Sequence, residues 1–294
     1  MGRRQSPAED TDAMSQPLSA ATIEFPSGNA VPSNVIAFPA ALEPQRPTWQ
    51  QPQENYAAIA TDPRYFQFAH IPDRIIRCLE LCGVRCERTV VREILLAYYL
   101  FIGVVDDELE LAQTELGEKI LRRLESPILS FDAETGSSRA LFMTEILKSH
   151  ISSSNRPQIL RKFRRLHQAS IKERQGRTIH HYIKQRKLVG RLTAELSHLI
   201  IIDRLVGNSA NAGKLMRDIG AVGCLVDSVI DAGADERAGL LAFQPTIFAT
   251  LFLFTHTLFL GMKLPLRHPR LLSLFVEAAR DNFRDRRRSL AISL

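Results

Sequence analysis

The chain runs without a proline from Pro157 to Pro245, and this constrains its fold more than any other feature. Stretches such as residues 91–105 and 188–205 are rich in Leu, Ile and Ala, and their apolar residues recur at helical spacing. The sequence contains no hairpin signal and no alternating run long enough to indicate strands. We therefore predict an all-α domain over residues 64–294.

Residues 1–63 differ from the rest in composition. They hold nine of the fifteen prolines, with three Arg against seven Asp and Glu, a net charge of −4 in a chain of +6. Residues 64–294 therefore carry +10. We predict a disordered Pro-rich tail over residues 1–63, followed by one helical domain. Four cysteines form no disulfide framework and no apolar signal segment follows Met1, which favours a cytoplasmic protein.

A first acidic cluster follows an apolar helix that begins near Leu95. Four carboxylates fall within five residues, and Asp106 and Glu110 are four apart, so they share one helix face. Without a neutralising cation this pair would repel. The pattern fits either a helix that emerges into water or a cation site.

A second acidic cluster repeats every four residues, at Asp227, Asp231 and Asp235. The residues between are small or apolar, and no Lys or Arg follows until Arg237. A partly buried carboxylate stripe needs a cation, and oxygen ligands alone select a hard ion such as Mg²⁺ shared with a phosphate group. The alternative is an acidic stripe on the surface.

A basic segment lies between the two clusters. Residues 156–191 contain twelve Lys and Arg and one acid, Glu173. A solvated helix face and an acidic lipid site are both open interpretations. A third is a diphosphate held by Mg²⁺ on one side and basic side chains on the other. Only Phe163 and Tyr182 interleave as large aromatics, so base stacking is not indicated and no nucleic-acid partner is expected.

Together these motifs resemble the class I isoprenoid synthases, and most closely their squalene/phytoene synthase branch. The branch's first metal motif, Ala-x-Tyr-x-Phe-x-x-x-x-Asp-Asp-x-x-Asp, is matched from Ala97 to Glu110, with Glu in place of the last Asp. Its second motif is matched by Asp227, Asp231, Asp235 and Gly239. Tyr182 with Val189-Gly190 is similar to the Tyr…Val-Gly helix between them.

The resemblance implies a helical bundle of the isoprenoid synthase type with a central apolar cavity. It further implies a Mg²⁺-dependent prenyltransferase of isoprenoid biosynthesis, acting on prenyl diphosphates by head-to-head condensation. A class I terpene cyclase, which is a lyase, remains an alternative. A non-catalytic relative that binds prenyl lipid or a membrane is another.

The resemblance also implies roles for particular residues. The expected metal ligands are Asp106, Asp107, Glu110, Asp227, Asp231 and Asp235. The catalytic residues among them are Asp106, Asp107, Asp227 and Asp231. Substrate binding is expected from Tyr182, Arg177, Lys184, Arg186, Arg191 and Arg237. Two positions depart from the branch, because Gly103 and Ile230 stand where it usually has Arg.

An apolar run near the C-terminus contains no charged residue from position 238 to 262. Pro245 breaks it and leaves residues 246–262, a helix of about 25 Å. We favour a buried helix that lines the cavity. Peripheral membrane contact through residues 246–270 and a true membrane span are the alternatives. In the peripheral case Lys263, Arg267 and Arg270 would meet lipid phosphates.

Overall fold

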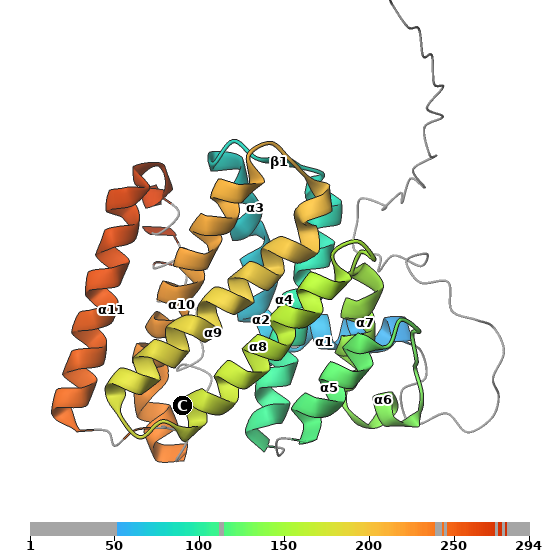
Figure 1. Ribbon diagram of the computed structural model, residues 1–294, viewed down its shortest axis with the longest axis horizontal. Helices are drawn as coiled ribbons and strands as arrows, with labels where there is room; N and C mark the ends of the chain where they lie inside the picture. Colours follow the sequence, from blue (N-terminus) through green and yellow to red (C-terminus); the bar gives the residue numbers. More distant parts are fainter. Residues whose placement is uncertain are drawn as a thin grey trace, which may run out of the picture. The chain divides into compact units, whose positions relative to one another are not determined.

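The computed structural model describes residues 52–111, 115–238, 243, 246–273, 276–277 and 280. Most of these residues are helical, which confirms the predicted all-α class (Figure 1). The strands among them are β1 (Arg85–Cys86) and β2 (Leu205–Val206), which pair antiparallel. Most of the predicted tail, residues 1–63, lies outside the described residues, but its end from Pro52 onward is helical.

The helices follow one another with short connections. Their bounds are α1 Pro52–Thr61, η1 Pro63–Tyr65, α2 Phe66–Ala69, α3 Ile71–Leu81, α4 Arg88–Leu111, α5 Glu115–Glu125, α6 Ala133–Ser137, α7 Arg139–His150, α8 Arg156–Gln175, α9 Ile179–Ile201, η2 Ile202–Arg204, α10 Ser209–Ala238, α11 Ile247–Arg267 and η3 Pro269–Leu271. Three helices begin at a hydroxyl side chain that accepts a hydrogen bond from the first turn: Ser138 for α7, Thr178 for α9 and Thr246 for α11.

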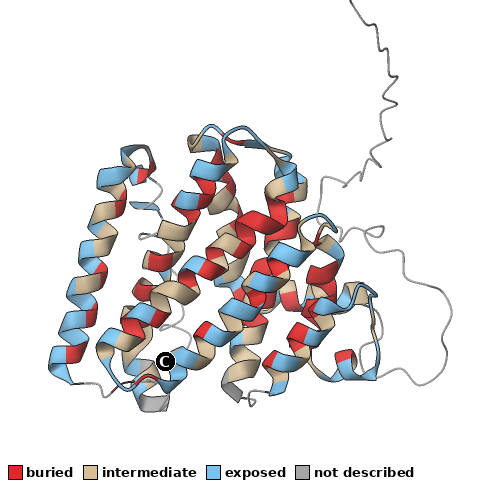
Figure 2. Cartoon of the chain, viewed as in Figure 1, coloured by how far each residue is buried: buried red, intermediate tan, exposed pale blue. Residues whose placement is uncertain are grey.

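The core lies where α4 meets α7 and α9, and the buried residues gather along these helices (Figure 2). Tyr98 and Leu100 of α4 are fully buried. The Tyr98 hydroxyl donates to the Thr193 carbonyl oxygen of α9 at 2.8 Å, so a buried polar group is satisfied and fixes one helix against the other. The apolar part of α4 thus holds the acidic end of the same helix in a fixed direction.

Helices α9 and α10 approach each other closely at Gly190 and Gly220. A Cβ added to Gly190 would lie 2.2 Å from the Gly220 carbonyl oxygen, and one added to Gly220 would lie 2.3 Å from that of Gly190. Only glycine therefore fits at this crossing. Arg186 lies one turn before Gly190, and Asp227 about two turns after Gly220. The crossing thus sets how near the two side chains come.

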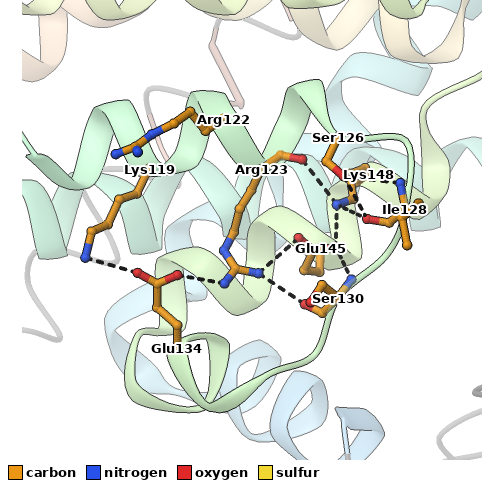
Figure 3. Close-up of a pocket in the computed structure, with 9 residues that line it drawn as sticks. All are labelled: Lys119, Arg122, Arg123, Ser126, Ile128, Ser130, Glu134, Glu145 and Lys148. Atoms are coloured by element: carbon orange, nitrogen blue, oxygen red, sulfur yellow. Dashed lines mark hydrogen bonds and ion pairs between the residues drawn. The ribbon is translucent and has the colours of Figure 1, made fainter.

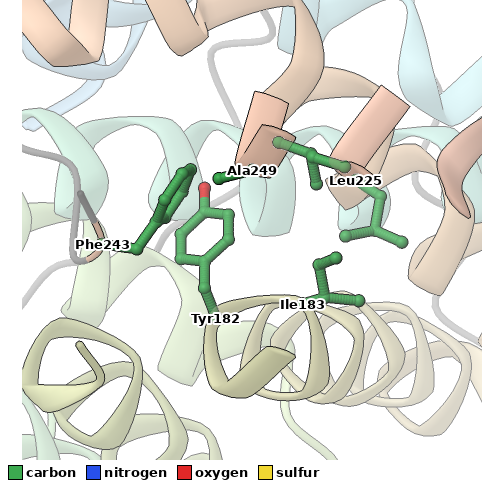
Figure 4. Close-up of a cluster of buried hydrophobic side chains, with 6 residues drawn as sticks. Tyr182, Ile183, Leu225, Phe243 and Ala249 are labelled. Carbon is green, nitrogen blue, oxygen red and sulfur yellow. The ribbon is translucent and has the colours of Figure 1, made fainter. Parts of the chain in front are cut away.

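Helix α11 packs beside α10 through one apolar cluster (Figure 4). The cluster comprises Tyr182, Ile183, Leu225, Phe243, Ala249 and Leu253. Only 22% of the most apolar stretch of α11 is buried. Within the described residues α11 touches the bundle along one side only, which contradicts the favoured prediction of a buried helix.

Candidate active site

Arg186 lies at the centre of a polar cluster formed by α8, α9 and α10. Its guanidinium donates to the Ser228 hydroxyl at 2.9 Å and to the Cys224 carbonyl oxygen at 3.3 Å. It also donates to the carboxylates of Glu173 at 3.3 Å and Asp227 at 3.2 Å. With 22% of its side chain exposed, Arg186 is a largely enclosed cation that joins three helices.

The carboxylates of α4 and α10 come together around this arginine. The charge of Asp106, at the end of α4, raises the pKa of Asp227 and of Asp235 on α10, although desolvation contributes more in both cases. Desolvation also raises the pKa of Glu173 on α8, and Asp106 adds to that shift. The structure therefore brings Asp106 and Asp227, which are 121 positions apart in the sequence, within electrostatic reach of one another.

Asp227 is the most strongly perturbed of these acids. Although 57% of its side chain is exposed, the surrounding protein desolvates it and raises its pKa to about 6. Arg186 opposes the shift, while Asp231 and Asp106 add to it. Asp106 is likewise accessible to solvent, yet desolvation raises its pKa. Accessible carboxyls that repel one another are suited to take up a cation.

The carboxylate oxygens of the acidic cluster fit a hard metal ion, although they are not arranged as a complete set of metal ligands. Among the described residues, no three His, Cys, Asp or Glu side chains are placed as a ready metal site. Asp227 and Asp231 nevertheless share a hydrogen bond, and all the acids of the cluster offer oxygen donors. Oxygen donors of this kind suit Mg²⁺, which also retains several waters. In the structure Arg186 supplies the positive charge instead.

Asp107 does not join this cluster, contrary to the prediction. Its carboxylate accepts hydrogen bonds from the Tyr65 hydroxyl at 2.9 Å and from Arg64 at 3.2 Å. Successive residues on a helix point about 100° apart, so Asp106 and Asp107 face different neighbours. The side chains of Glu110 and Arg237, two further predicted site residues, lie outside the described residues.

The predicted substrate-binding residues separate into two groups. Tyr182 is buried one turn before Arg186, with its ring centroid 5.0 Å from that of Phe243. Arg177, Lys184 and Arg191 are exposed, and none has a hydrogen bond or ion pair to the acidic cluster in the described part of the chain. The structure thus places Arg186 and Tyr182 beside the acidic cluster and does not bring the other three there.

The sequence analysis missed two side chains of the cluster, Glu173 and Ser228. Glu173 carried a usable signal, since it is the single acid in the basic segment. Ser228 carried none, because a lone serine in a helix is ordinary. A third group, Arg174, donates to the Leu109 carbonyl oxygen at 3.2 Å, and its charge lowers the pKa of Asp106.

Gly103, one of the two departures from the branch, has a packing explanation. A Cβ at this position would lie 2.7 Å from the Phe68 ring, which packs against α4. A larger side chain would have to displace that ring. A side chain at position 103 would therefore conflict with the packing of Phe68 on α4.

A separate hollow of about 300 Å³ lies between α5 and α7 (Figure 3). Lys148 pairs there with Glu145 at 2.6 Å, with the two side chains 2% and 0% exposed. Arg123 lies 3.5 Å from the same carboxylate. None of the predicted site residues lines this hollow. Apart from Arg122, its lining charges are paired with one another.

The chain matches no family model, no curated protein and no solved structure.

Proposed function

We propose that this protein is an enzyme of the class I isoprenoid synthase type, which ionises a prenyl diphosphate with the help of Mg²⁺. The observation that carries the proposal is the convergence of Asp106 with Asp227 and Asp235 around Arg186. A cluster with several carboxylates and one arginine offers ligands for a metal ion and a donor for a phosphate group.

Within that class we favour the squalene/phytoene synthase branch. The support is the match of both motifs in order, with the Tyr182 and Gly190 helix between them. The proposed substrate is farnesyl or geranylgeranyl diphosphate, and the proposed reaction is head-to-head condensation. The proposed fold is a bundle of that branch's type with an apolar cavity.

Asp106, Asp227, Asp231 and Asp235 would hold the metal, directly or through water. Bound Mg²⁺ would neutralise the diphosphate oxygens and make the group easier to release. Arg186 would turn from Asp227 to the diphosphate, because its planar fork of donors matches phosphate oxygens.

Ionisation breaks the bond between the allylic carbon and oxygen. The electron pair leaves with the diphosphate, and an allylic cation remains. The apolar cluster beside Arg186, which includes Tyr182, Leu225 and Phe243, would keep water from this cation. Exclusion of water protects the cation until the second substrate reacts with it.

The test is diphosphate release by the purified full chain. Farnesyl and geranylgeranyl diphosphate are supplied in turn, with and without Mg²⁺, and the organic product is identified. Mg²⁺-dependent release with a product of doubled carbon number supports the proposal. Mg²⁺-dependent release with a product of unchanged carbon number would indicate cyclisation in place of condensation. No release from either substrate contradicts the enzyme proposal and leaves the prenyl-lipid-binding relative.

A further inference from the structure

Helix α11 presents an unusually large apolar surface to solvent. We define the α11 surface as its large side chains that are at least half exposed: Ile247 84%, Phe248 84%, Leu251 56%, Phe254 50%, Leu258 51%, Phe259 52%, Met262 52% and Leu266 81%. Isolated exposed apolar residues are ordinary, but a contiguous set on one helix marks an interaction site.

The contact of α11 with the bundle is narrow. Its buried residues are Ala249, Leu253, Thr257 and Leu264, which fall on one stripe at helical spacing. Most of its outward-facing residues are nevertheless apolar, with Thr250, Thr255 and Arg267 as exposed exceptions. An exposed apolar surface of this extent is normally covered by protein or lipid, so the α11 surface needs a covering partner.

The surroundings of the α11 surface are positively charged. Lys263 lies over the Phe259 ring at 4.0 Å from its centroid, and Arg267 is exposed one turn further on. No Asp or Glu occurs between positions 246 and 273. The end of the helix therefore carries cations beside its apolar surface, and the helix itself supplies no acid to pair with them.

Helix α9 adds a second row of cations next to α11. Lys187 lies 3.5 Å from the His256 ring nitrogen of α11, and the ring centroids of His180 and Phe252 are 4.7 Å apart. Lys184 and Arg191 share this face of α9 by helical spacing, and both are exposed. These are two of the cations that the structure leaves away from the acidic cluster.

We propose that the α11 surface docks on an anionic lipid bilayer. The helix lies along the interface, its apolar side chains enter the acyl boundary, and the Lys and Arg beside it meet lipid phosphates. By length and composition α11 could also cross a membrane. The buried stripe and the cluster with Tyr182 and Leu225 instead hold it against the bundle.

A second copy of this chain fits the surface less well than a lipid. Its own α11 would bring the same cations and no acid between positions 246 and 273 to neutralise them. Anionic headgroups match both the apolar surface and its charge. The charge complementarity therefore favours a membrane over self-association.

The test is sedimentation of the full chain with vesicles of phosphatidylcholine alone or mixed with phosphatidylglycerol. We expect tight binding only to the anionic vesicles. The double substitutions Phe248→Ser with Leu251→Ser, and Lys263→Gln with Arg267→Gln, should each weaken it at least about tenfold. Ile128→Ser, at a side chain 72% exposed elsewhere, is the matched control and should bind as the wild type does.

A second double substitution on the same surface, Leu258→Ser with Met262→Ser, should weaken binding as well, which distinguishes lost binding from a local folding defect. Circular dichroism verifies that each variant keeps its helix content. Absence of binding to anionic vesicles, or equal binding by all variants, would overturn the proposal. A dimer in solution that the same substitutions disperse would assign the surface to a second copy. Resistance to alkaline extraction would assign α11 as a span. The assay needs neither Mg²⁺ nor a diphosphate, so it is independent of the proposed activity.

Discussion

Arg186 pairs with acids of α8 and α10, and its charge partly offsets the desolvation that raises the pKa of Asp106 on α4. Its guanidinium contacts Glu173 of α8 and Asp227 and Ser228 of α10, while its own backbone belongs to α9. Removing a charge so placed leaves carboxylates that repel one another without compensation. Its role in the proposed reaction is to bind the diphosphate, so its loss should show in activity.

We predict that Arg186→Gln lowers Mg²⁺-dependent diphosphate release by about 10- to 100-fold. One charge-assisted hydrogen bond is worth about 1.5–3 kcal/mol, and about 1.4 kcal/mol is tenfold in rate. Lys184→Gln is the matched control, since it removes a cation from another face of the same helix and should change the rate by less than about twofold. Equal effects of the two substitutions would contradict the assignment.

His150 gives a prediction for the pH dependence of stability. Burial lowers its pKa from 6.5 to about 4, so the folded protein keeps the ring neutral. The unfolded chain takes up a proton below pH 6.5, and the folded chain does so only near pH 4. The stability due to neutral His150 is therefore complete above pH 6.5 and is lost as the pH falls toward 4.

We expect His150→Gln to lose less unfolding free energy than the wild type between pH 6.5 and 4.5. The quantity to compare is the difference in unfolding free energy between the two proteins at each pH. Asp227, whose pKa is raised in the folded state, adds stability as the pH falls and so changes the total in the opposite direction in both proteins. Urea unfolding at several pH values measures it. Parallel pH profiles for both proteins would show that His150 does not titrate as described.

At the scale of elements, the crossing of α9 and α10 fixes the site. We predict that Gly190→Ala destabilises the fold by about 1–3 kcal/mol, because the new methyl group meets the Gly220 carbonyl oxygen and α9 must shift. Gly223→Ala is the control on α10, since its Cβ would meet nothing within 4 Å. This control should stabilise the helix by up to about 1 kcal/mol. Denaturant unfolding measures the stability of both variants. Equal stabilities of Gly190→Ala and Gly223→Ala would refute the close approach of α9 and α10 at Gly190.

The pairing of α5 with α7 depends on the buried pair Glu145 and Lys148. We predict that Glu145→Ala destabilises the protein by about 3–5 kcal/mol, because it leaves Lys148 buried beside Arg123 without its carboxylate. Glu125→Ala removes an exposed partner of Arg164 outside this cluster and should cost less than about 1 kcal/mol. Thermal unfolding compares them, and a similar cost for both would argue against a buried pair.

At the scale of the whole molecule, the sequence predicts the helical class and both acidic motifs because these follow from local spacing. It could not single out Arg186 among twelve cations. Which face of α9 turns inward depends on the contact of Gly190 with Gly220, far apart in the chain. For the same reason it could not separate Asp106 from Asp107, whose partners Arg64 and Tyr65 belong to another element.

The placement of α11 shows a different limit. Its composition is the same whether it lines a cavity or lies on the surface, so periodicity and length cannot distinguish the two. The structure distinguishes them, because the buried stripe is narrow and the large side chains face outward. The proposed site between α4, α8, α9 and α10, together with the proposed lipid contact of α11, would suit a substrate with a charged head and an apolar tail.

The central claim is that Asp106 and the stripe on α10 act together on one Mg²⁺-bound diphosphate. The direct measurement is Mg²⁺-dependent diphosphate release by the variants Asp106→Asn and Asp227→Asn. The control variant is Asp218→Asn, which alters a carboxylate on the opposite face of α10. The account predicts a loss of at least about 100-fold in the first two and near wild-type release in the third. Release that persists without Mg²⁺, or that survives either of the first two substitutions, would contradict it.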